Sequence, residues 1–75
     1  MDESKVFAPF TPAQVANLNG FQESGVGHAF TCADHSDRRL LAREPGWECP
    51  RWDCNYMQVW AHAWMADGTW RTYKA

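Results

Sequence analysis

Four residues in two short turns constrain this chain more than any other feature. Two residues separate Cys32 from His35, four separate Cys49 from Cys54, and thirteen lie between the two pairs. Structural zinc sites hold the metal in a tetrahedron of four Cys or His side chains, usually supplied as two closely spaced pairs. Short turns also bring ligands together at low entropic cost. The pattern therefore predicts a domain folded around a structural zinc ion.

The short length of the chain is a further reason to expect a stabilising metal. Seventy-five residues form one small domain, which buries only about 60–65% of its unfolded surface. Chains of this size often need a metal, disulfides or oligomerisation for stability. Three cysteines cannot all pair within one chain, so a metal fits them better than a disulfide framework. Free thiols and the lack of a signal peptide or an apolar span indicate a cytoplasmic protein with no membrane segment.

The fourth ligand is less constrained than the three cysteines. His35 has the spacing that a chelating turn requires, and it is the predicted ligand. His28 and His62 are alternatives, although each is more typical of a packing or surface histidine. Asp34 and Asp53 are remote candidates.

The N-terminal part predicts a lead-in followed by a helix. Residues 1–10 are expected to be a flexible lead-in, and residues 11–75 the single domain. Thr11-Pro12-Ala13-Gln14 is typical of a helix start, because Thr caps, Pro suits the first turn and Gln completes a capping box. The helix is expected over about residues 12–23, with Gly20 weakening it by about 1 kcal/mol relative to Ala.

The remainder predicts antiparallel strands. We expect strands over residues 29–32 and 40–43, a turn over 44–47 and a strand over 47–49. Period-two alternation favours a long strand over 55–65, although 61–66 also suits a helix. Asp67-Gly68 suits a hairpin turn into a last strand over 69–73. The expected fold is a small α+β domain, in which the N-terminal helix packs on a three- to four-stranded antiparallel sheet.

The order of these motifs resembles that of small zinc-ribbon-like proteins of bacteriophages and bacteria, most of them uncharacterised. The resemblance covers about residues 10–65, and it implies a zinc-ribbon-like fold with a bound metal rather than an activity. The chain departs from the family pattern in its Cys-x4-Cys turn, where the family has Cys-x2-Cys, and in Trp64, where the family has Phe. The matching segments are Thr11–Val15, His28–Cys32, His35, Gly46–Pro50 and Cys54–Met65.

Aromatic and basic residues suggest what the domain binds. Five tryptophans are many for this length, and most are expected in the core. Arg51, Trp52 and Trp70 are the predicted partner-binding residues, because Trp and Arg are enriched at binding hot spots. A nucleic-acid-binding ribbon is the alternative, but a net charge of −2 does not favour it. That alternative would use Arg38, Arg39, Arg43 and Arg51.

The sequence thus predicts a zinc-stabilised protein-interaction module, which the resemblance suggests is phage-derived and binds a host or phage protein. It is expected to be a monomer or a homodimer and not an enzyme, since four protein ligands leave no open position on the metal. A zinc-dependent hydrolase using Glu48 or Asp53 is a remote alternative, and it would require that His35 is not a ligand.

Overall fold

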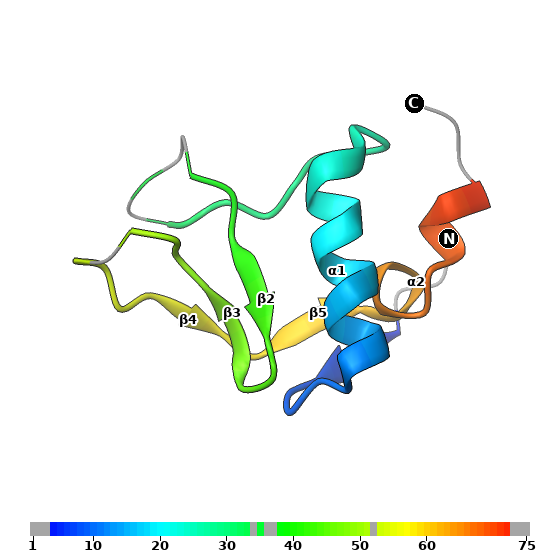
Figure 1. Ribbon diagram of the computed structural model, residues 1–75, viewed down its shortest axis with the longest axis horizontal. Coiled ribbons are helices and arrows are strands. Elements are labelled where there is room, and N and C mark those ends of the chain that lie inside the picture. Colours follow the sequence, from blue (N-terminus) through cyan, green and yellow to red (C-terminus); the bar gives the residue numbers. More distant parts are fainter. Residues whose placement is uncertain (1–3, 34, 36–37, 52, 73–75) are drawn as a thin grey trace.

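The computed structural model describes residues 4–33, 35, 38–51 and 53–72. Within them the chain forms two antiparallel sheets, one long helix and two short helical turns (Figure 1). This confirms a small α+β fold with antiparallel sheets. None of the helices in these segments is long and apolar enough to cross a bilayer.

Helix α1 (Pro12–Ser24) begins and ends close to the predicted positions. The Thr11 hydroxyl accepts a hydrogen bond from the Gln14 backbone N–H, and the Gln14 side chain accepts one from the Thr11 N–H. Both bonds satisfy donors that the first helical turn leaves without partners. At the other end the helix stops at Gly25 in a left-handed conformation.

Strands β2 (Leu41–Arg43), β3 (Gly46–Glu48) and β4 (Met57–Gln58) form the three-stranded sheet, in the order β2-β3-β4. The side-chain amide of Asn19 pairs with both the N–H and the C=O of Ala42, so helix α1 covers the outer edge of β2. On the other side β3 approaches β4 closely. A Cβ at Gly46 would lie 2.7 Å from the Gln58 carbonyl oxygen, and its φ of 144° also favours glycine.

The second sheet corrects the expectation for the N-terminus. Strand β1 (Lys5–Phe7) pairs antiparallel with β5 (Trp60–His62), so part of the expected flexible lead-in is a strand. Its register places Val6 opposite Ala61, which is fully buried. An apolar contact in the core thus fixes the start of the described chain.

Three other expectations differ from the structure. Residues 29–32 form no strand, only an isolated bridge between Thr31 and Arg39. The expected strand over 55–65 is divided into β4 and β5, and it ends in α2 (Ala63–Ala66), which agrees with the helical alternative for residues 61–66. Within the expected strand over 69–73, the described residues form a 3₁₀ turn, η1 (Thr69–Thr72), and residue 73 lies outside the described part of the chain. This turn packs against α1, where Trp70 donates its indole N–H to the Asn17 carbonyl.

The elements separate into two ends of an elongated molecule about 35 Å long. Helices α1, α2 and η1 with sheet β1-β5 make up the helical end, and the three-stranded sheet with its loops makes up the metal end (Figure 1). Trp47 is fully buried between them, edge-on to Phe30, and donates to the Trp60 carbonyl.

Candidate metal centre

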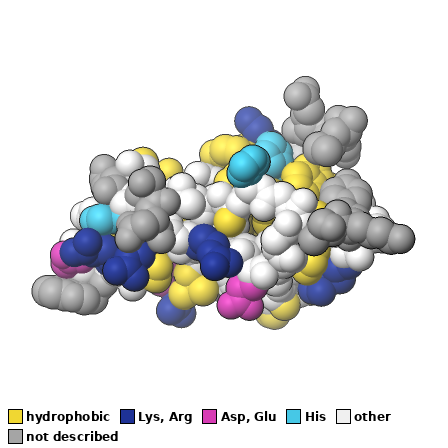
Figure 2. All heavy atoms as spheres, turned by 90° about the horizontal axis from the view of Figure 1, so that it is seen from above, with side chains coloured by type: hydrophobic (Ala, Val, Ile, Leu, Met, Phe, Trp, Pro, Cys, Tyr) yellow, Lys and Arg dark blue, Asp and Glu magenta, His cyan; other side chains and the backbone are white. Residues whose placement is uncertain are grey.

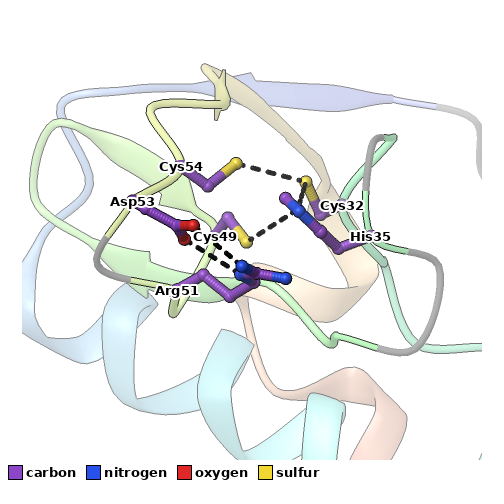
Figure 3. A network of polar contacts seen from close by, with 6 residues as sticks. All are labelled: Cys32, His35, Cys49, Arg51, Asp53 and Cys54. Atoms are coloured by element: carbon purple, nitrogen blue, oxygen red, sulfur yellow. Dashed lines mark hydrogen bonds and ion pairs between the residues drawn. The ribbon is translucent and has the colours of Figure 1, made fainter.

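Two loops of the metal end supply the four predicted ligands. Cys32 and His35 lie in the loop between α1 and β2, Cys49 follows β3, and Cys54 precedes β4. Their side chains point toward one another (Figure 3). The prediction that these four residues converge is confirmed.

Backbone hydrogen bonds shape the loop that carries the first pair. The His35 N–H donates to the Cys32 carbonyl, which bends the chain so that the two side chains share one side of the turn. The Arg38 N–H donates to the His35 carbonyl, and the Cys32 N–H donates to the Arg38 carbonyl. These bonds close the loop at its base.

A second turn carries the other pair. The Cys54 N–H donates to the Arg51 carbonyl, and the Arg51 guanidinium forms two hydrogen bonds with the Asp53 carboxylate. Cys49 reaches the same point from the end of β3. The four-residue spacing between Cys49 and Cys54 therefore still closes a chelating turn.

Three of the distances between ligand atoms match those of a tetrahedral zinc site. The Cys32 Sγ lies 3.6 Å from His35 Nδ1 and 3.7 Å from Cys54 Sγ, and Cys49 Sγ lies 3.8 Å from His35 Nδ1. Zinc bonds of about 2.3 Å to sulfur and 2.0–2.1 Å to nitrogen place tetrahedral ligand atoms roughly 3.5–3.8 Å apart. All four ligand atoms lie within 4.8 Å of one another. The residues therefore fit a metal ion with three sulfur ligands and His35 Nδ1 as the fourth.

The surroundings of the cluster raise the pKa of one of its thiols. The Tyr56 backbone hydrogen bond acts to lower the pKa of the Cys54 thiol, but partial burial and the neighbouring thiols of Cys32 and Cys49 outweigh it, and the pKa is raised. A bound cation reverses this effect, because a thiol that coordinates a metal loses its proton. Nearby, the hydrogen bond from Arg51 is the main cause that lowers the pKa of the Asp53 carboxyl.

The other two histidines lie outside the cluster. His28 is exposed in the segment after α1. His62 is half-buried in β5 between the rings of Trp60 and Trp64, and it stacks nearly parallel to Trp64 with ring centres 5.9 Å apart. Among the described residues, only His35 joins the three cysteines in a group that is able to hold a metal.

The predicted partner-binding residues do not form one surface. Arg51 is exposed on the turn between Cys49 and Cys54. Trp70 is only 6% exposed and packs against Phe21 in the core, so little of its ring is left for a partner. The prediction for Trp52 lies outside the described residues.

A cavity beside the cluster had no counterpart in the sequence analysis. Leu41, Glu48 and Met57 lie opposite one another across β2, β3 and β4 and form its floor. Its volume is about 450 Å³, and the turn that carries Arg51 borders it together with Cys49 and Cys54. Strand register creates this row, and register cannot be read from spacing along the chain.

Comparison of the chain with protein-family models, curated proteins and solved structures found no match. The evidence for a metal site is therefore the geometry of the Cys/His cluster itself.

Proposed function

We propose that this chain is a small zinc-stabilised protein-interaction module of the zinc-ribbon type. Following the resemblance in its sequence, we further propose that it is phage-derived and binds a host or phage protein in the bacterial cytoplasm. The observation that carries the proposal is the convergence of Cys32, His35, Cys49 and Cys54 at tetrahedral distances.

The donor set supports zinc in a structural role. Thiolate and imidazole ligands suit zinc, and four protein ligands complete its coordination sphere. A catalytic zinc requires an open position for water. When bound, zinc would link the loop before β2 to the turns after β3 and before β4, and its binding energy would contribute to folding.

Three arginine side chains are already paired with groups of the protein, which supports a protein partner rather than nucleic acid. Arg43 pairs with Glu48, Arg51 pairs with Asp53, and Arg39 donates to the Gln22 carbonyl. On the face seen in Figure 2, basic side chains lie scattered among acidic, apolar and neutral ones and form no continuous basic surface. Phosphate recognition normally requires such a surface.

Exposed apolar side chains supply contact area for a partner. Among the described residues, the large apolar side chains that are exposed are Phe7, Met57 and Val59. Met57 lies on the outer face of the three-stranded sheet, next to the turn that carries Arg51. We therefore place the binding surface at the metal end, on Arg51 and Met57.

The test is capture of partners from a bacterial lysate by the immobilised zinc-loaded protein, followed by titration with the purified partner. We expect binding that persists as salt is raised, and we expect Met57→Glu to weaken it. Phe7→Glu is the control, because Phe7 is also apolar and exposed but belongs to β1 at the helical end. Binding to DNA or RNA that falls steeply with salt would contradict the proposal, because it would indicate phosphate contacts.

A further inference from the structure

The three cysteines of the cluster differ in their access to solvent. Cys32 is 1% exposed and Cys49 is 5% exposed, whereas Cys54 is only half-buried. The cavity on the outer face of the sheet is bordered by Cys49 and Cys54 but not by Cys32 or His35. A small molecule in this cavity therefore reaches Cys54 more readily than either of the other thiols.

The neighbours of Cys54 determine what an attack there produces. The Cys54 Sγ points toward the Cys32 Sγ, 3.7 Å away (Figure 3). Susceptibility of a cysteine to oxidation follows its thiolate character and its exposure. Exposure to the cavity therefore selects Cys54 among the three cysteines, and Cys32 is the thiol within reach of it.

We propose that Cys54 is a reversible oxidation site, and that a peroxide entering the cavity converts Cys54 and Cys32 to a disulfide. The Cys54 thiolate attacks one peroxide oxygen, the O–O bond breaks, and the products are a sulfenic acid and, after one proton is taken up, water. The Cys32 thiolate then attacks the sulfenic sulfur, an S–S bond forms, and hydroxide leaves and takes up a second proton as water. Two thiolates lose two electrons in total, and the peroxide accepts them.

Formation of this disulfide would release the zinc ion. A disulfide removes two of the four ligands, and Cys49 with His35 alone would not hold zinc tightly. Reduction by a dithiol restores both thiols, so the change is reversible. This inference rests on the proposed zinc site.

The first experiment measures the order of reaction in the unmodified protein. After the zinc content is shown to be one ion per chain, the protein is treated with less than one equivalent of N-ethylmaleimide, and the modified cysteines are identified by peptide mass spectrometry. We expect modification at Cys54 first. Modification at Cys32 first, or equal modification of all three, would overturn the proposal. A chain that binds no zinc would refute the proposed metal site instead.

The second experiment uses hydrogen peroxide itself. We expect a disulfide between the peptides containing Cys32 and Cys54, release of zinc in step with it, and recovery of zinc binding after dithiothreitol. Release of zinc with a Cys49 disulfide, or with sulfonic acid and no disulfide, would overturn the assignment of the pair.

A pair of variants tests the route through the cavity. Met57→Trp places a bulky ring on the cavity floor. We expect it to slow the reactions of Cys54 with N-ethylmaleimide and with hydrogen peroxide several-fold. Val59→Trp is the control, because Val59 is similarly exposed but does not line the cavity. Equal rates in the two variants would show that the cavity is not the route.

Discussion

The two ends of the molecule differ in the side chains that they bury. The helical end contributes Leu18, Phe21 and Met65, which are among the largest fully buried side chains. Among the described residues of the metal end beyond Trp47, the buried side chains are no larger than leucine, namely Cys32, Leu40, Ala42 and Cys49. Apolar burial can support the first end, and we expect the second to depend more on a bound metal. The proposed zinc site would then divide the stability of this small domain between a core and a metal.

Removal of the metal tests this comparison most strongly. We expect a chelator at neutral pH to abolish cooperative thermal unfolding measured by circular dichroism, and Cys49→Ser to do the same. Zinc binding in small domains supplies about 10–16 kcal/mol, which is comparable to the total stability of a protein, about 5–15 kcal/mol. In hydrogen exchange, protection should fall first in β2, β3 and β4 and later in α1. An unchanged melting temperature after chelation would contradict the proposal that a metal stabilises the metal end.

Alanine variants of the three histidines test which of them is the fourth metal ligand. His35→Ala should lower zinc affinity, measured by competition with a chromophoric chelator, far more than His62→Ala or His28→Ala. His35 Nδ1 lies within 4 Å of two thiols, whereas His62 packs among aromatic rings. Affinity should also fall in acid, because ligands must lose protons to bind the metal. A larger effect of His62→Ala would mean that the ligand assignment is wrong.

Trp47 joins the two ends, so truncating it should affect both. We expect Trp47→Ala to lower the free energy of unfolding by about 3–5 kcal/mol, the usual cost of removing a buried aromatic ring. Trp47→Phe should cost less, because it keeps an aromatic contact with Phe30 and loses only part of the ring and the bond to Trp60. Urea unfolding measures the loss of free energy of unfolding in each of the two variants. Equal effects of the two variants would show that the hydrogen bond, not the packing, matters.

Gln22 makes a polar connection between the ends. Its buried side-chain amide donates to the carbonyls of Phe30 and Leu40 and accepts from the Phe30 N–H. We expect Gln22→Leu to lower the free energy of unfolding by about 2–4 kcal/mol, because it leaves buried backbone groups without partners. Glu23→Leu is the control on the adjacent, exposed position. Similar losses in the two variants would contradict the assigned role.

The helix start should give the smallest effect. Thr11→Ala removes the cap of α1, and we expect a loss of about 1 kcal/mol in the free energy of unfolding. Zinc affinity should stay unchanged, because Thr11 lies at the helical end. A loss of zinc affinity would show that the two ends are more tightly coupled than their contacts indicate. Thr31→Ala, at an exposed position near the ligand loop, provides the comparison.

The features that sequence predicted well depend on neighbouring residues. The cap at Thr11, the β2–β3 hairpin around Glu44-Pro45 and the two ligand turns are local, so residue type and spacing specify them. The strand over 69–73 was predicted wrongly for the opposite reason. Trp70 is β-prone by type, but its burial against α1 decided the conformation.

The sequence alone thus determined the Cys/His cluster and the helix, because both follow from residue type at fixed short spacing. The tertiary structure decided what each glycine and strand residue does. Gly20 weakens a helix when considered alone, yet a Cβ there would lie 2.9 Å from the Trp70 ring, so its absence lets Trp70 pack on α1. Likewise, only the register of three strands places Leu41 and Met57 on either side of Glu48 and opens the cavity next to the Cys/His cluster. Such contacts join residues far apart in the chain, and no local pattern encodes them.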